Sequence, residues 1–201
     1  MFGHCIHLSK IGHTNHESKF PFWSWISFLA LLFLFCTTFT FNSESKTITI
    51  GSHNLHNFKT SVDYHKSCIQ THSGIWFGQE LWLSEKQLHL LHQLNSQFTA
   101  RSGMEESLSS GVMRGRPYGG VSIAWSPELN HVINPLSNYK HKRVVAIELI
   151  TTSKSLILIS AYMPFLDSRD RTSSIAEYID TISMIDLIIN DHPDHHVIIA
   201  I

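Results

Sequence analysis

A carboxylate at the end of an apolar run is the first group in this chain that can do chemistry. The segment Ile75–Gln79 has the composition of a buried strand and is followed directly by Glu80. After a short apolar stretch, Ser84–Gln87 has the spacing of a capping box that opens a helix. Open α/β sheets bind ligands at such places, beyond the carboxyl end of a strand. Glu80 is therefore either a ligand-binding acid or an ordinary surface acid at a strand end.

Two further polar side chains stand at strand ends. Asn54 follows the predicted strand Thr47–Ile50, and Tyr162 follows the predicted strand Leu156–Ala161. Each has a plain structural explanation when it is taken alone, because Asn often caps a turn and an aromatic side chain often fills a core. The alignment of three such residues with three strand ends is what favours a functional interpretation.

The elements that must position these residues lie between residues 46 and 201. Alternating and continuous apolar runs predict strands, and spacings of three and four predict helices. The short polar turn Thr151–Lys154 predicts an antiparallel hairpin. The glycine-rich stretch 100–120 predicts a long loop. The expected strands are 47–50, 75–79, 121–125, 144–149, 156–161 and a buried one at 197–201, and the expected helices are 57–72, 84–97 and 169–190.

This layout predicts an α/β fold with mixed sheets. The last helix is expected to pack through one apolar face. That face would be made by Ile175, Ile179, Ile182, Ile185 and Ile189.

Composition narrows the class of protein further. The 201 residues carry a formal net charge of −1, which gives no overall signature of nucleic-acid binding, although a local patch can suffice. The three cysteines lie far apart without a C-x-x-C spacing, which argues against a disulfide framework and a zinc ribbon. The fifteen histidines are interpreted as compositional bias, because no close set adjoins a Cys or carboxylate pattern that would complete a metal site.

The N-terminal region is expected to be separate from this domain. Residues 1–19 form a polar extension, and residues 20–43 contain no charged side chain and no histidine. The second segment is long enough for a transmembrane or signal-anchor helix, and its flanking charges predict a cytoplasmic N-terminus. A cleaved signal peptide and a translated non-coding extension are the alternatives. The expected location is the membrane if residues 20–43 insert, and otherwise the cell interior or the nucleus.

The ordered motifs resemble the endonuclease/exonuclease/phosphatase superfamily, which includes deoxyribonuclease I, apurinic endonucleases, sphingomyelinases and inositol phosphatases. The resemblance covers residues 46–201 and rests on Asn54, Gln79–Trp82, Gly119–Ile123 and Ala161–Pro164. The run Gly115–Val121 is most similar to the endonuclease domains of non-LTR retrotransposons. The implied fold is a partial four-layer α/β sandwich of the deoxyribonuclease I type, preceded by the apolar N-terminal helix.

The resemblance also implies metal-dependent hydrolysis of a phosphodiester, with DNA as the partner. Mg²⁺ would be held by Glu80 and Asn54, and the Tyr162 hydroxyl would act as the catalytic donor to a phosphate oxygen. Basic and aromatic residues are the candidates for contacts with the nucleic acid, with solvated surface charge as the alternative. These candidates are Arg114, Arg116, Tyr118 and Arg143.

The superfamily's Gly-Asp-x-Asn motif is absent from the sequence, and so is its later Asp-His pair, because Asp194 and His195 precede the predicted strand 197–201. We therefore expect a truncated domain without detectable magnesium-dependent nuclease or phosphatase activity. We also expect a marginal fold, because part of an apolar sheet face would be uncovered. The alternatives are a membrane-anchored phosphoesterase of the same superfamily and a non-catalytic membrane or interaction protein.

Overall fold

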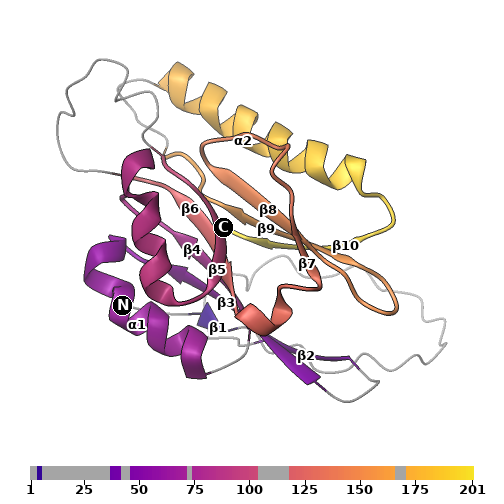
Figure 1. Ribbon diagram of the computed structural model, residues 1–201. Helices are drawn as coiled ribbons and strands as arrows, with labels where there is room; N and C mark the ends of the chain where they lie inside the picture. Colours follow the sequence, from indigo (N-terminus) through magenta and orange to yellow (C-terminus); the bar gives the residue numbers. More distant parts are fainter. Residues whose placement is uncertain (1–3, 6–36, 42–45, 72–73, 104–117, 166–170) are drawn as a thin grey trace, which may run out of the picture.

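The computed structural model describes residues 4–5, 37–41, 46–71, 74–103, 118–165 and 171–201. In this part of the chain the strands form two sheets that lie between helices (Figure 1).

The first sheet carries two of the three strand ends of interest. Its strands run in the order β1-β3-β4-β6-β5, and β2 also pairs with β3. β3 and β4 are parallel, and their register places Asn54 opposite Gln79. Every other pairing in this sheet is antiparallel. The strands are β1 (His4–Cys5), β2 (Thr37–Phe41), β3 (Lys46–Asn54), β4 (Gly74–Gln79), β5 (Gln97–Arg101) and β6 (Val121–Trp125).

The second sheet carries the third strand end. Its order is β10-β9-β8-β7, from β7 (Ile133–Pro135), β8 (Val144–Leu149), β9 (Leu156–Ala161) and β10 (His196–Ala200). β8 and β9 form the predicted antiparallel hairpin, while β10 runs parallel to β9. The expectation of a buried last strand is wrong, because β10 lies at the edge of the described sheet and its residues are half-buried or exposed.

Three apolar clusters define four layers. The inner faces of both sheets share one core, in which Phe77 and Ile123 of the first sheet meet Ile147 and Leu158 of the second. A second cluster joins the outer face of the first sheet to helices α1 and η1, and a third joins the second sheet to helix α2. The layers are therefore helix, sheet, sheet and helix (Figure 1). The predicted four-layer α/β class with mixed sheets is confirmed.

The three helices lie close to the positions predicted from the sequence. α1 spans Phe58–Thr71, η1 is a 3₁₀ helix over Glu85–Leu94, and α2 spans Arg171–Asp191. The predicted capping box at η1 is confirmed, since the Ser84 N–H donates to Gln87 Oε1 at 3.2 Å.

The predicted apolar face of α2 is wrong in part. Ile185 is buried, but Ile175, Ile179 and Ile182 are 39–58% exposed. The helix instead turns Ser174, Thr181, Ile185 and Ile188 toward the sheet. Ser174 and Thr181 are buried, whereas Ile175, Ile179 and Ile182 remain on the surface.

Four of the described strands were missed by sequence patterning, namely β1 and β2 in the N-terminal region and β5 and β7 within the domain. β5 occupies residues that were assigned to the end of a helix and the start of a loop, and β7 lies in a stretch without a strand prediction. Phe98 and Thr99 favour an extended backbone, and their pairing with β6 stabilises it. The rest of the predicted loop, residues 104–117, lies outside the described residues.

The prediction of an apolar helix over residues 20–43 is wrong for the C-terminal part of that segment. Thr37–Phe41 forms β2 and pairs antiparallel with β3, as its β-branched and aromatic composition favours. This leaves 17 residues, 20–36, of the predicted span, and they lie outside the described residues together with most of the 1–19 extension. Among the residues that the structure does describe, no helix is long and apolar enough to cross a bilayer.

Candidate metal and phosphate site

The predicted site residues meet where β3, β4 and β9 end. Asn54 is the last residue of β3, Glu80 follows β4 on the adjacent strand, and Tyr162 follows β9 of the facing sheet. The Tyr162 hydroxyl lies near the Glu80 carboxylate, close enough for that carboxylate to influence the pKa of Tyr162. The side chain of Glu80 is only 15% exposed, so its charge lies at a largely covered position.

A histidine that the sequence analysis left aside joins this group. His56 Nδ1 lies 2.6 Å from Glu80 Oε2, and the His56 backbone N–H donates to Asn54 Oδ1 at 3.2 Å. In the sequence, His53 and His56 form a close histidine set without a completing carboxylate pattern, and this pairing of His56 with Glu80 was not foreseen from it. The signal was present in the sequence as a histidine two residues after Asn54, but its acid partner is 24 positions away and comes close only through the parallel pairing.

The backbone at this site is strained. His56, Asn57, Glu80 and Trp82 have φ angles of 45°, 107°, 54° and 52°, and they are four of the five non-glycine residues with positive φ in the described chain. Such conformations cost on the order of 1–3 kcal/mol each and cluster at functional sites.

Backbone hydrogen bonds between the two turns hold this geometry in place. The Asn57 N–H donates to the Glu80 carbonyl at 3.0 Å, and the Phe58 N–H donates to the Leu81 carbonyl at 3.0 Å. The two turns are therefore locked together, which fixes the directions in which the His56 and Glu80 side chains leave the backbone.

The Gly119-Gly120 pair lets a third segment approach. These residues have φ angles of 63° and 88°, which glycine adopts without steric cost. The Gly119 carbonyl accepts a hydrogen bond from the Trp82 N–H at 2.9 Å. A Cβ atom on Gly119 would stand 3.6 Å from the Tyr162 ring, so the loop lies directly against that ring.

Gln79 connects the two sheets beside the site. Its side chain is 4% exposed, accepts a hydrogen bond from the Ser52 hydroxyl and donates to Ser160 Oγ, both at 3.3 Å. Ser52 lies on β3 and Ser160 on β9, next to the strand ends that carry Asn54 and Tyr162. This bridge fixes the spacing between the sheets, and with it the distance between Glu80 and Tyr162.

Arg143 lies behind Tyr162 rather than on the surface. Its guanidinium is centred 5.6 Å from the centroid of the Tyr162 ring and pairs with Glu177 on α2 at 2.9 Å. Arg143 is 8% exposed, and this burial does not support the expected contact with a nucleic-acid backbone. The arginine instead orients the tyrosine and couples the site to α2.

The Tyr162 hydroxyl is held in its neutral, proton-donating form. Burial is the largest cause that raises the pKa of Tyr162, and the nearby charge of Glu80 acts in the same direction. Arg143 opposes them with a smaller effect. A neutral phenol can donate to a ligand oxygen at any pH near neutrality.

The remaining predicted nucleic-acid contacts divide into two groups. Arg114 and Arg116 lie outside the described residues. Tyr118 is 48% exposed and precedes the glycine pair that packs on Tyr162, so a ligand at the site could reach its ring.

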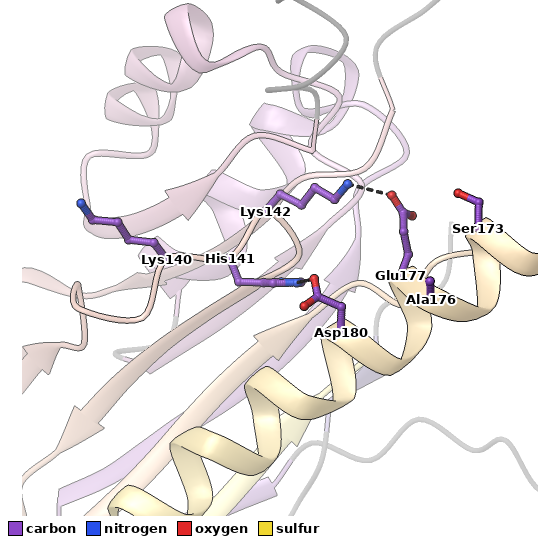
Figure 2. A pocket seen from close by; sticks show the side chains of 7 residues that line it. All are labelled: Lys140, His141, Lys142, Ser173, Ala176, Glu177 and Asp180. Carbon is purple, nitrogen blue, oxygen red and sulfur yellow. Dashed lines mark hydrogen bonds and ion pairs between the residues drawn. The ribbon is translucent and has the colours of Figure 1, made fainter.

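A hollow of about 520 Å³ lies elsewhere, between the β7–β8 connection and α2 (Figure 2). Lys142 Nζ lies 2.7 Å from Glu177 Oε1, and His141 Nε2 lies 2.9 Å from Asp180 Oδ2. Lys140 points away from these pairs in Figure 2. Because these facing polar side chains pair with each other, the hollow is lined by contacts that tie α2 to the sheet rather than by groups free to hold a ligand; these contacts form a polar seam.

The donor groups at the site fit partial coordination of a divalent cation. Glu80 offers a carboxylate oxygen, Asn54 an amide oxygen and His56 an imidazole nitrogen. In the chain as far as it is described, no group of three or more His, Cys, Asp or Glu side chains is arranged to hold a metal ion. A cation here would therefore depend on few protein ligands, with water or a phosphate oxygen completing its shell.

Comparisons with known proteins give structural neighbours only. No family model and no curated protein matches the sequence. Similar solved structures include a 3′ phosphatase, NExo, from Neisseria bound to a product DNA hairpin, with 14% identity, a TM-score of 0.49 and coverage of 75% of this chain and 55% of that one.

Two further similar solved structures are endonucleases. The endonuclease domain of TRAS1, a telomere-specific non-LTR retrotransposon, has 12% identity, a TM-score of 0.46 and coverage of 75% and 56%. An AP endonuclease from Archaeoglobus fulgidus has 13% identity, a TM-score of 0.46 and coverage of 72% and 51%. All three are members of the endonuclease/exonuclease/phosphatase superfamily, which is the one that the sequence motifs resemble. This chain spans about half the length of each.

Proposed function

We propose that residues 46–201 are part of a metal-dependent phosphodiester hydrolase domain of the endonuclease type. The observation that carries this proposal is the meeting of His56 and Tyr162 with the carboxylate of Glu80, beside Asn54, whose amide oxygen accepts the His56 backbone N–H. This meeting occurs at the carboxyl ends of strands, on a backbone held in left-handed conformations. Strained, interlocked backbone of this kind is expected where geometry serves a ligand rather than stability.

Each residue has a defined part in this chemistry. A divalent cation such as Mg²⁺ supplies charge neutralisation on the phosphate and activates a water molecule. Glu80 would hold the cation, and Asn54 would orient it or a phosphate oxygen without adding charge. Tyr162, neutral and braced by Arg143, would donate its proton to a phosphate oxygen.

This chain is proposed to bind the metal and the phosphate without turning substrate over. The described residues place one carboxylate at the site, and the only imidazole that contacts that carboxylate there is the paired one of His56. Catalytic groups act as a unit, so a partial set leaves little rate.

DNA is the proposed substrate class, with a retroelement endonuclease as the proposed type. The support is the run Gly115–Val121 in the sequence and the exposed ring of Tyr118 beside the glycine pair. An aromatic ring at this place can stack on a base, and such stacking contributes about 1–3 kcal/mol per base.

A membrane-anchored phosphoesterase is the second candidate, and location at a membrane is part of it. It is favoured by residues 20–36, an uncharged run that includes three aromatic residues in its first four positions. Seventeen residues are at the lower limit for crossing a bilayer. Resistance of the expressed chain to alkaline extraction from membranes would support this candidate, and full release would contradict it.

The test of the main proposal is metal-dependent binding of DNA. Fluorescence anisotropy of a labelled duplex should rise on addition of the full chain with Mg²⁺ or Mn²⁺, and the rise should be lost with EDTA. Glu80→Gln and Tyr162→Phe should each weaken binding tenfold or more, while Glu85→Gln, an acid at the exposed start of η1, should not. Nicking of supercoiled plasmid should be absent. Equal binding by the wild type and Glu80→Gln would sink the proposal.

A further inference from the structure

His56 gives this site a nitrogen donor that a pure magnesium site would not need. Its Nδ1 atom lies 2.6 Å from Glu80 Oε2, which brings both atoms within reach of one ion. The same turn places the Asn54 amide oxygen close by, since Asn54 Oδ1 accepts the His56 backbone N–H at 3.2 Å. Asn54 and His56 come from the end of β3 and the turn after it, and Glu80 comes from the residue after β4.

An ordinary ion pair does not account for this contact. The His56 side chain is 65% exposed, and ion pairs with an exposed partner contribute little to stability. Both partners also sit on left-handed backbone, with φ of 45° at His56 and 54° at Glu80, which costs more than such a pair returns. The backbone hydrogen bond from Asn57 to Glu80 maintains the approach of the two turns independently of the side chains.

The type of donor decides the type of ion. Mg²⁺ prefers oxygen ligands and binds imidazole poorly, whereas first-row transition-metal dications accept imidazole nitrogen together with carboxylate oxygen. From the contact between His56 and Glu80 we infer that His56 is a metal ligand and that the site prefers a transition-metal dication such as Mn²⁺ or Zn²⁺ over Mg²⁺. This inference rests on the proposed function, because Glu80 must be a metal ligand for His56 to be one.

The test uses Mn²⁺ with the full chain in the absence of DNA. Electron paramagnetic resonance of free Mn²⁺ gives the affinity, and pulsed measurements detect a directly bound ¹⁴N nucleus. We expect a ¹⁴N coupling in the wild type and Mn²⁺ that resists displacement by a hundredfold excess of Mg²⁺. His56→Gln should lose the coupling and weaken Mn²⁺ binding at least tenfold. His131→Gln, at an exposed histidine away from these strand ends, is the matched control and should change neither.

The outcomes separate this inference from the proposed function. If Glu80→Gln abolishes Mn²⁺ binding while His56→Gln binds normally and the wild type shows no ¹⁴N coupling, the inference fails and the proposed function stands. If neither variant changes the affinity, both fail. Near-ultraviolet circular dichroism of each variant, compared with the wild type, verifies that a loss of binding is not a loss of folding.

Discussion

Acid should destabilise this fold through one buried histidine on α1. His65 is fully buried, and neither of its ring nitrogens has a hydrogen-bond partner among the described residues. Its ring meets that of His53 edge to face at a centroid distance of 5.7 Å. Burial, and then the neighbouring His53, lowers the pKa of His65 from 6.5 to about 3. The folded protein therefore binds a proton at this position far more weakly than the unfolded chain does.

The sign and the size of the effect follow from linkage. Because the folded-state pKa is depressed, the unfolded chain takes up the proton first, and stability is lost as the pH falls from about 6.5 toward about 3. At pH 5, about 1.5 units below the unfolded pKa, the loss is about 2 kcal/mol, and it approaches about 4–5 kcal/mol near pH 3. Domains of this size have total stabilities of about 5–15 kcal/mol, so a transition in the acid range is expected.

Urea unfolding of the wild type and of His65→Leu at pH 7.5, 6, 5 and 4 measures this contribution. Leucine fills a similar volume without ionising, so the variant should lose about 2 kcal/mol less than the wild type between pH 7.5 and pH 5. It should also be at least as stable at pH 7.5, because two unpartnered polar atoms leave the interior. His131→Leu, at an exposed position, should follow the wild type. Parallel losses in the wild type and His65→Leu would refute the reasoning.

Three further predictions concern the site and α2. Gln79→Leu should lower stability by about 1–3 kcal/mol, because it leaves the hydroxyl of the buried Ser160 without this partner, and a double-mutant cycle with Ser160→Ala in urea should show coupling. Gly119→Ala should weaken metal-dependent DNA binding as well as stability, by about 1 kcal/mol or more, because φ of 63° is strained for alanine, and anisotropy together with thermal melting measures both. Ile179→Glu should change stability by less than about 0.5 kcal/mol, whereas Ile188→Glu should unfold the domain, so equal effects in circular dichroism melts would contradict the observed face of α2.

The sequence predicted the ends of β4 and β9 well because each depends on local pattern, whereas β3 runs past its predicted end at Ile50 as far as Asn54. Glu80 and Tyr162 directly follow apolar runs, and such runs fix where a strand must stop. The parallel pairing of β3 with β4 brings Asn54 and Glu80 together, and the packing of the two sheets brings Tyr162 to them from β9. The glycine pair 119–120 was noted in the sequence as part of the motif Gly119–Ile123, and the structure adds that both glycines have positive φ.

What the sequence could not predict depends on tertiary contacts. The contact of His56 with Glu80 requires the parallel register of β3 and β4, which no local pattern specifies. The buried face of α2 was misassigned because the helix carries isoleucines on two sides, and only the sheet decides which side is covered. Arg143 lies in a basic run that indicates solvent exposure, but Glu177 and the Tyr162 ring draw it inward.

The central claim is that a divalent cation binds at Glu80, and paramagnetic broadening tests it most directly. Substoichiometric Mn²⁺ added to the isotope-labelled full chain should broaden the amide resonances of residues 54–57, 79–82 and 118–120 before any others. The same addition to Glu80→Gln should leave these resonances sharp. Broadening that centres on Asp180 and Glu177 in the polar seam beside α2, or that is unchanged in Glu80→Gln, would contradict the assignment of the site.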